Sequence, residues 1–396
     1  MIKNKEENIK KLENYLDERK NIKNDIVDLS KVIAYKNGIN VDLDENQKEL
    51  LNMIPEKKHT IFVLLDGFGY YKLKTLSDSS VLKQNLKTKL KTVNPTSTAA
   101  VLTSIVSATY PTKHGIFGWW DYNKEFDLNY YPLLFKDRRT LKSLKEKGIK
   151  LENIYKFNTI FDGFNKKVNI IEDRQIINSE YSKFIAGKNA NRHGYYSIKQ
   201  AFSSLTENLK QEKESTFNYL YIDGLDEASH AYGTESRDVS KIIEAVENGI
   251  KEVKNTIKDV SIILTADHGQ VDMARMLYLN QKTNYLNYFY AMPSVDTRMI
   301  SFFVKEKYKE EFEEKFIEEF ADDVILLTKE EATKYMLFGS DKLSDIANDS
   351  LGEYIAVVVN NKFMVCDRIT LDDKMNTKGN HSGLTKEETT IPLVVI

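Results

Sequence analysis

The segment TIFVLLDGFG (60–69) is a continuous apolar run, rich in strand-forming residues, that stops at an Asp-Gly pair. A strand buried on both faces has this composition, whereas a strand with one face in water alternates apolar and polar residues. Strands of this kind belong to parallel sheets that helices cover on both sides. The segment therefore predicts an α/β domain with Asp66 at the carboxyl end of a central strand, where functional residues of such sheets gather.

The sequence on either side of this segment repeats the pattern. FNYLYIDGLD (217–226) and VSIILTAD (260–267) are further buried strands, and apolar residues at helical spacing fill the stretch 239–257 between them. KTVNPTSTAAVLTSIVSA (91–108) has the character of a short strand, a turn and a helix of small residues, and IPLVVI (391–396) is a last strand. Strands that alternate with helices predict a mostly parallel sheet with helices on both faces.

Two regions lie outside this pattern. Residues 1–57 contain apolar side chains at helical spacing, including Ile26, Leu29 and Ile33, and predict a helical N-terminal extension. The segment between His268 and His381 contains strand and helix patterns of its own and is too long for a loop. We therefore predict a small α+β cap over 281–349, inserted into a core that comprises 58–280 and 350–396.

Composition excludes several classes of protein. The 396 residues are 41% hydrophobic and 29% charged, which argues against a disordered chain. The 57 basic and 59 acidic side chains nearly balance, which argues against a protein that coats nucleic acid or binds membranes through a polybasic surface. The single cysteine, Cys366, excludes a disulfide framework and a cysteine-rich zinc module. No apolar run approaches the roughly 18 residues of a membrane span, and the charged start lacks a secretory apolar core, so we expect a cytoplasmic location without membrane contact.

Residue types that bind metals recur at the predicted strand ends. One such residue alone is more often a turn or helix-capping residue, and an isolated Asp-His pair says little. Their combination, each at the carboxyl end of a strand or in the turn after it, predicts two divalent metal ions, most plausibly zinc, held by nitrogen and oxygen ligands. The candidates are Asp66, Asp226, His230, Asp267, His268 and His381.

A hydroxyl-rich turn completes the set. PTSTAA (95–100) lies where a strand gives way to a helix, and a hydroxyl at a helix N-terminus is placed to attack an anionic phosphoryl group beside the N–H groups of the first turn. Threonine and serine at such a position more often serve only as helix caps. The neighbouring metal-ligand residues favour the catalytic interpretation.

These residues, in this order, resemble the alkaline phosphatase superfamily and, within it, the nucleotide pyrophosphatase/phosphodiesterase branch. The resemblance covers roughly residues 58–280 and 350–396. The family's Pro-Thr-x-Thr and Tyr-Pro-x-x-His-Gly-Ile elements read PTSTAAVLTSIVSATYPTKHGI (95–116) here. Its Tyr-Ile-x-x-x-Asp-x-x-x-His element reads YIDGLDEASH (221–230), its Asp-His-Gly reads ADHG (266–269), and its late histidine element reads HSGL (381–384).

The resemblance implies a role for each of these residues. Thr98 takes the position of the nucleophile. Asp226, His230 and His381 take the positions of the ligands of a first zinc ion. Asp66, Thr98, Asp267 and His268 take those of a second zinc ion. The implied reaction is hydrolysis of a phosphodiester or pyrophosphate, with nucleotides among the candidate substrates, through a covalent phospho-threonine intermediate.

The sequence departs from the family at two positions and leaves alternatives open. Val101 stands where the nucleotide-cleaving branch usually has Asn, and Gly69 stands where it has Arg. A phosphomonoesterase or a phosphonate hydrolase would use the same metal sites. An iron oxygenase would use Asp226, His230 and His381 alone, and a non-catalytic binding protein would use the fold without turnover.

Three aromatic residues and three further histidines lie outside the predicted set of metal ligands. Phe68, Trp119 and Trp120 are candidates for stacking on a nucleobase, although most aromatic side chains serve in cores. His114 belongs to the family motif and is expected to have a structural role, whereas His59 and His193 are expected on the surface or in loops.

Overall fold

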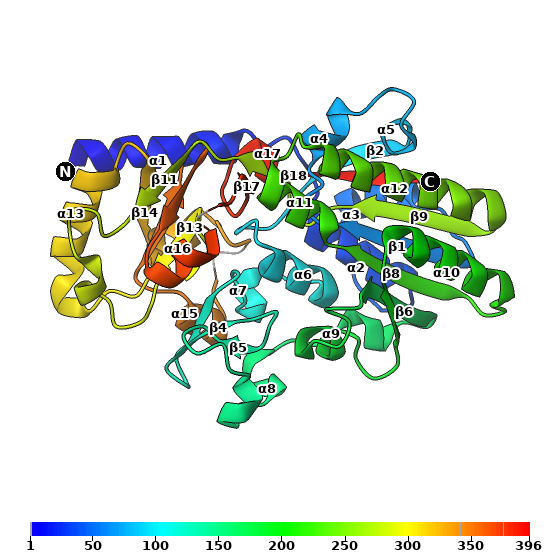
Figure 1. Ribbon diagram of the computed structural model, residues 1–396, viewed down its shortest axis with the longest axis horizontal. Helices are drawn as coiled ribbons and strands as arrows, with labels where there is room; N and C mark the ends of the chain where they lie inside the picture. Colours follow the sequence, from blue (N-terminus) through cyan, green and yellow to red (C-terminus); the bar gives the residue numbers. More distant parts are fainter. Residues whose placement is uncertain (1, 340–341, 375) are drawn as a thin grey trace.

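A seven-stranded sheet forms the larger half of the molecule (Figure 1). The computed structural model describes residues 2–339, 342–374 and 376–396. The strand order is β2-β18-β9-β1-β8-β6-β7, and neighbouring strands are parallel except at β18, which runs antiparallel to both neighbours. The strands are β1 (His59–Leu65), β2 (Leu86–Lys91), β6 (Lys167–Asp173), β7 (Asn191–Tyr195), β8 (Thr216–Ile222), β9 (Val260–Thr265) and β18 (Thr390–Val395).

The predicted central strands are in the middle of this sheet. Every residue of β1, β8 and β9 is buried, as their unbroken apolar sequences predict. β1 pairs in parallel with both β8 and β9, so the turns that follow these three strands lie next to one another. The predicted mostly parallel sheet is therefore confirmed, with β18 as its antiparallel member.

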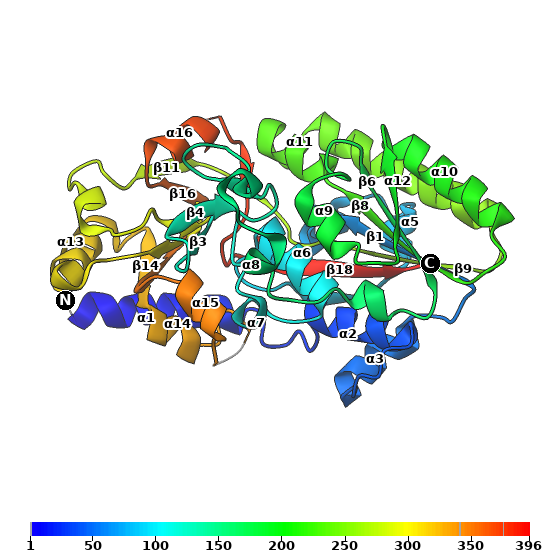
Figure 2. The ribbon, with the colours of Figure 1, turned by 90° about the horizontal axis from the view of Figure 1, so that it is seen from below.

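Helices cover both faces of the larger sheet. Figure 2 shows α10 and α12 above the strands and α2 and α3 below them. α12 packs on α10, and α2 packs on α6 and α3. The helices of this half are α2 (Ile26–Lys36), α3 (Glu45–Met53), α4 (Tyr70–Thr75), α5 (Val81–Gln84), α6 (Thr98–Ser107), α7 (Pro111–His114), α8 (Leu151–Ile154), α9 (Glu180–Ile185), α10 (Ile198–Gln211), α11 (Gly224–Tyr232), α12 (Arg237–Thr256) and α17 (Lys386–Thr389).

A second, smaller sheet lies beside the first. Its order is β12-β13-β15-β14, and all its neighbours are antiparallel. Side chains on β14 alternate between two apolar clusters: Val324 and Leu326 join the cluster of helix α13 (Lys309–Phe320), and Ile325 and Leu327 join the cluster of α1 (Ile2–Asp17). The strands are β12 (Ser294–Val295), β13 (Met299–Phe302), β14 (Val324–Thr328) and β15 (Tyr354–Val358).

The helical N-terminal extension contacts both halves. α1 packs against β14 of the smaller sheet, whereas α2 packs against α6 of the larger half. β15 belongs to the smaller sheet although it follows residue 349, the predicted end of the cap, so that sheet extends beyond the range 281–349. As a folding unit, that range stays a prediction.

The remaining elements are short. Two-stranded ladders join β11 to β16 and β10 to β17, and β3, β4 and β5 form a small sheet. In the described ranges, no helix combines the length and the apolar character that crossing a bilayer requires. The elements are β3 (Asp121–Asn123), β4 (Leu128–Tyr131), β5 (Lys136–Asp137), β10 (Val271–Asp272), β11 (Arg275–Tyr278), β16 (Lys362–Val365), β17 (Gly379–Asn380), α14 (Lys329–Lys334), α15 (Asp345–Ser350) and α16 (Arg368–Lys374).

Candidate active site

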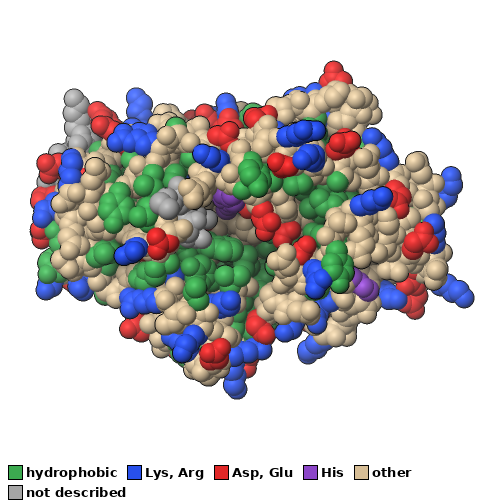
Figure 3. Space-filling model, viewed as in Figure 1, with side chains coloured by type: hydrophobic (Ala, Val, Ile, Leu, Met, Phe, Trp, Pro, Cys, Tyr) green, Lys and Arg blue, Asp and Glu red, His purple; other side chains and the backbone are tan. Residues whose placement is uncertain are grey.

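The carboxyl ends of the central strands meet at one edge of the larger sheet. Asp66 follows β1, Asp226 and His230 lie on helix α11 after β8, and Asp267 and His268 follow β9. Figure 3 shows a histidine and several acidic side chains in a hollow near the middle of one face of the molecule. This edge is where the sequence predicts the functional residues.

Two groups of side chains at this edge offer metal-ligand atoms within 4.8 Å of one another. Asp226, His268 and His381 form one group, and Asp66, Asp267 and His268 form the other. The two groups share His268, whose ring stacks on that of His381 with 3.8 Å between the centroids. His268 can serve only one cation through Nε2, so a second cation in the first group would depend on Asp226 and His381 with a further ligand.

Hydrogen bonds orient the three histidines for binding through the same ring atom. The Nδ1 atom of His381 lies 2.7 Å from the backbone oxygen of Thr96, and that of His230 lies 2.7 Å from the oxygen of Gly379. The Nδ1 atom of His268 lies 3.2 Å from the oxygen of Gly269. A proton on each Nδ1 leaves Nε2 with a lone pair for a metal ion, as histidine ligands require.

The carboxylates are held in a comparable way. The Tyr221 hydroxyl donates to Oδ2 of Asp66, and the Gln270 amide donates to Oδ1 of Asp226. Oδ1 of Asp66 and Oδ2 of Asp267 are buried and have no hydrogen-bond partner among the described residues. Unpartnered buried carboxylate oxygens are costly unless a cation neutralises them. This donor set of imidazole nitrogens and carboxylate oxygens fits divalent cations.

The charges at this site conflict without a cation. Burial and the neighbouring Asp267 raise the pKa of Asp66 well above its ordinary value, and burial raises the pKa of Asp267 to about 6. Burial also opposes ionisation of Asp226, but His230 and His381 outweigh it and lower the pKa of Asp226. Burial lowers the pKa of His268 and His381 to about 4, so both rings are neutral at pH 7.

Thr98 is the first residue of helix α6 and lies against the second group. Its Oγ1 atom is 3.3 Å from Nε2 of His268, and the residue is 7% exposed. The preceding Ser97 does not cap the helix, since its hydroxyl donates to Asp296. No side chain thus caps the N–H groups of the first turn, and these groups, with the positive end of the helix dipole, favour an anionic group beside Thr98.

The structure brings all seven predicted site residues together. Nε2 of His268 lies 3.5 Å from Oδ1 of Asp66 and 3.1 Å from Oδ2 of Asp267. Oδ1 of Asp226 lies 3.7 Å from Nε2 of His381, and its Oδ2 lies 3.3 Å from Nε2 of His230. Together with the contact between Thr98 and His268 and the stacking of His268 on His381, these distances link every member into one cluster.

The two departures from the family pattern are accounted for by packing. Val101 is fully buried among the apolar residues of the main core, where it packs as a core side chain. A Cβ atom on Gly69 would come within 2.8 Å of the Cα atom of Gly269 and 2.9 Å of the backbone oxygen of Glu387. The close approach of the three segments therefore leaves no room for a side chain at residue 69.

Two of the three aromatic residues predicted as candidates for stacking on a nucleobase are core residues. Phe68 is fully buried, and Trp120 is buried beneath the guanidinium of Arg138, 4.3 Å from the ring centroid. Trp119 is half-buried, 6.0 Å from the ring of Tyr131, and is the one member of the predicted three that is not buried. Stacking on a base by Phe68 or Trp120 is thereby excluded.

The other histidines differ in their surroundings. His114 is buried, and its ring joins the backbone N–H of Ile116 to the hydroxyl of Ser104 on α6, which agrees with a structural role. His59 was expected at the surface or in a loop, but it begins β1, is 3% exposed and bonds to Thr216. His193 lies exposed on the edge strand β7 rather than in a loop.

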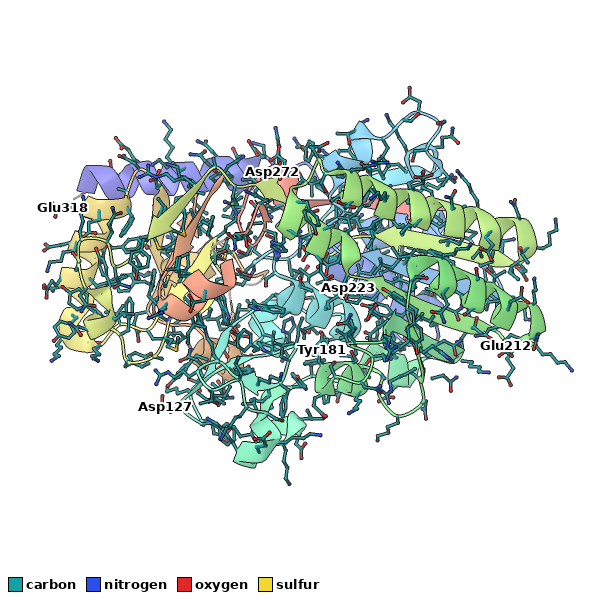
Figure 4. The ribbon with its side chains drawn as sticks, viewed as in Figure 1. Asp127, Tyr181, Glu212, Asp223, Asp272 and Glu318 are labelled. Carbon is teal, nitrogen blue, oxygen red and sulfur yellow. The ribbon has the colours of Figure 1, made fainter. Side chains whose placement is uncertain are left out.

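Sequence patterns did not single out Gln270 and Asp296, and they did not reveal the contact of Thr96 with His381. These contacts join distant segments, which no local spacing encodes. Asp223, at the end of β8, is labelled near the middle of the molecule in Figure 4. Burial and the nearby Glu227 raise the pKa of Asp223 to about 6, so two acidic side chains lie close together at the start of α11.

Comparisons with known proteins agree with this geometry. The model of the family "Type I phosphodiesterase / nucleotide pyrophosphatase" matches residues 60–384. The structure of murine ectonucleotide pyrophosphatase/phosphodiesterase 5 is similar to this one with a TM-score of 0.65 and 15% identity, over 85% of this chain and 87% of that chain. Phosphonoacetate hydrolase of Sinorhizobium meliloti 1021 gives a TM-score of 0.62 and 16% identity, over 86% and 91% of the two chains.

A curated relative matches over a shorter stretch. GPI ethanolamine phosphate transferase 1 of Emericella nidulans is 29% identical in an alignment of 85 positions that covers 19% of this chain and 9% of that protein. The chain thus matches much less than two thirds of that relative's length. At these identities the two structural likenesses concern the fold.

Proposed function

The chain belongs to the type I phosphodiesterase/nucleotide pyrophosphatase family, a family of hydrolases, and we propose that it cleaves a phosphodiester or pyrophosphate bond with Thr98 as the nucleophile. The observation that supports this proposal most directly is the position of Thr98. Its hydroxyl lies at the N-terminus of α6, 3.3 Å from His268 and beside two groups of metal-ligand residues.

The proposed ligand sets divide the cluster between two cations and assign His268 to the second, so that His230, whose Nε2 lies 3.3 Å from Oδ2 of Asp226, completes the first. Asp226, His230 and His381 would hold one divalent cation, and Asp66, Thr98, Asp267 and His268 would hold the other, with zinc favoured because three of the ligands are imidazoles. The cations, when bound, neutralise charge on the phosphoryl oxygens and lower the pKa of a hydroxyl bound to them. The unpartnered buried oxygens of Asp66 and Asp267 support this assignment.

The proposed reaction has two displacements. Oγ1 of Thr98 forms a bond to phosphorus while the bond between phosphorus and the leaving oxygen breaks, and the leaving group departs with a proton. Water then cleaves the bond between phosphorus and Thr98, which releases the product and restores the hydroxyl. The N–H groups at the start of α6 bind the phosphoryl oxygens in both steps.

The substrate class is also part of the proposal. A murine structural neighbour is known in an inactive form with AMP, which supports a nucleotide substrate here, and half-buried Trp119 is the remaining candidate for contact with a base. The similar phosphonoacetate hydrolase fold supports a phosphonate as the second candidate. A monoester substrate uses the same nucleophile but carries one more negative charge.

The test compares three substrates with the zinc-loaded protein. p-Nitrophenyl thymidine 5′-monophosphate, p-nitrophenyl phosphate and phosphonoacetate are supplied at equal concentration. We expect the diester to be hydrolysed fastest and Thr98→Ala to lose turnover by about three orders of magnitude or more, because the nucleophile is absent. Thr98→Ser, which keeps a hydroxyl, is the matched control and should retain part of the rate.

The outcomes separate the alternatives. Faster cleavage of the monoester or of phosphonoacetate assigns the chain to that substrate class instead. Turnover of Thr98→Ala at the wild-type rate rejects Thr98 as nucleophile. Two zinc ions per chain by elemental analysis support the paired site, whereas a single iron ion supports an oxygenase and no metal supports a binding protein.

A further inference from the structure

Thr96 connects the turn that carries Thr98 to the turn that carries His381. The side chain of Thr96 is fully buried, and its Oγ1 atom accepts a hydrogen bond from the N–H of Ser382 at 2.9 Å and donates one to the oxygen of Gly383 at 3.2 Å. The backbone oxygen of Thr96 accepts from Nδ1 of His381 at 2.7 Å. Three hydrogen bonds therefore join two segments that are some 285 residues apart along the chain.

The turn that Thr96 binds is strained. Ser382 has a φ of 84°, in the left-handed region that residues with a side chain rarely adopt. Such a conformation is unfavourable and persists only where surrounding contacts hold it. The second contact comes from the other side, where the N–H of Arg298 donates to Oγ of Ser382 at 3.2 Å. Thr96 and Arg298 therefore both form hydrogen bonds with the same strained residue.

We propose that Thr96 is a positioning residue whose hydroxyl holds the strained turn at Ser382 and thereby aims Nε2 of His381 at the metal-binding edge. The inference rests on the proposed function, since it takes His381 to be a metal ligand. It also assigns a purpose to the first threonine of PTST (95–98), whose hydroxyl bonds to the turn after His381.

The physical basis is the number of constraints on one histidine. The ring of His381 is fixed by one hydrogen bond to a backbone oxygen, which survives any substitution of the Thr96 side chain. The backbone of the turn is fixed by the hydroxyl, since Ser382 and Gly383 both bond to it. Without the hydroxyl, a buried N–H and a buried C=O lose their partner and the strained turn relaxes. The direction of Nε2 then changes while the ligand itself stays present.

Zinc affinity of the full chain tests this proposal without recourse to activity. The zinc dissociation constants are measured by competition with a chromophoric chelator, and the binding step that His381→Ala abolishes identifies the ion that His381 holds. Thr96→Val replaces the hydroxyl with a methyl group of similar size. We expect it to weaken that same step by 10- to 100-fold, the usual effect of removing a contact that orients a ligand, and to leave the other step unchanged.

Two further variants control for packing. Thr96→Ser keeps the hydroxyl and should bind zinc as the wild type does. Thr103→Val removes a hydroxyl from an equally buried threonine on α6, which bonds to Tyr181 rather than to the His381 turn, and should also bind zinc normally. If Thr96→Val does not fold, Thr96→Ala gives the same comparison without the added methyl group.

The results that would overturn the positioning role of Thr96 differ from the result that would overturn the proposed function. Unchanged affinity in Thr96→Val, or an equal loss in Thr103→Val, overturns the inference. A loss in Thr96→Ser as large as in Thr96→Val assigns the effect to the methyl group and also overturns it. A wild-type chain that binds no zinc or other divalent ion overturns the proposed function, whereas normal binding by both wild type and Thr96→Val overturns the role of Thr96 alone.

Discussion

Arg298 and Glu388 form a fully buried ion pair between the two sheets, with Nε of Arg298 2.7 Å from Oε1 of Glu388. Arg298 directly precedes β13 of the smaller sheet, and Glu388 lies in α17, directly before β18 of the larger one. Glu388 also accepts from the N–H of Gly383 and from Thr385. One carboxylate therefore fixes the smaller sheet, strand β18 of the larger sheet and the His381 turn relative to one another.

Removal of this carboxylate should destabilise the whole chain. Glu388→Ala leaves the Arg298 guanidinium buried without its counter-charge, and we expect the free energy of unfolding to fall by about 3–5 kcal/mol, measured by urea titration. Asp238→Asn, which breaks the exposed pair of Asp238 with Lys241, should change it by less than about 1 kcal/mol. A loss for Glu388→Ala no larger than for this control would contradict the structural role of the pair.

Loss of His381 should reduce metal content and activity together. In His381→Ala one ligand of the proposed first cation is missing, so we expect elemental analysis to find fewer ions per chain and the hydrolysis rate to fall by at least about 100-fold. His193→Ala, on the exposed edge strand β7, serves as the control and should change neither quantity. Full metal content with normal turnover in His381→Ala would show that this histidine is not a ligand.

Tyr221 should matter through the hydroxyl that it donates to Asp66. In Tyr221→Phe the Asp66 carboxylate loses its phenolic donor, and we expect zinc affinity at the Asp66 group to fall by about 10-fold or more. Tyr219→Phe is the matched control: Tyr219 lies two residues earlier on β8, and its buried hydroxyl has no hydrogen-bond partner among the described residues. A rise in KM with unchanged zinc affinity would instead place Tyr221 in contact with the substrate.

Glu172 should make stability depend on pH. Burial raises the pKa of this β6 carboxyl to about 7 from an ordinary value of 4.5. Between these values the unfolded chain releases the proton and the folded chain keeps it, so the unfolded state binds fewer protons and stability falls as pH rises. At about 1.4 kcal/mol per unit, the loss approaches roughly 3 kcal/mol by pH 8.

The substitution Glu172→Gln isolates this effect. We expect the variant to match the wild type in urea unfolding at pH 4 and to exceed it at pH 8, because glutamine cannot ionise. Glu207→Gln, at an exposed position of α10, should leave the pH profile of the wild type unaltered. Equal slopes of stability against pH in Glu172→Gln and wild type would refute the assignment.

The sequence predicts the central strands and the cluster because both depend on local patterns. Unbroken apolar runs at β1, β8 and β9 mark strands buried on both faces, and parallel strands place the residues after them at one edge. Asp66, Asp226 and Asp267 could therefore be expected near one another before any coordinates were known.

Other features depend on contacts that no local pattern specifies. An amphipathic helix has an apolar face but does not name its partner, so the attachment of α1 to the smaller sheet and of α2 to the larger half was not predicted. A run such as Tyr354–Val358 fits either sheet equally well. The contacts of Thr96 with His381 and of Arg298 with Glu388 depend on the assembled fold and have no signature in spacing.

The position of β18 has a consequence for synthesis of the chain on the ribosome. β18 lies between β2 and β9, although β2 ends at Lys91 and β18 begins at Thr390. While a nascent chain still lacks β18, β2 and β9 each present an unpaired edge to other growing chains, and pairing across so great a separation in sequence is slow. Nascent chains of this protein are therefore expected to need chaperone protection until β18 has left the exit tunnel.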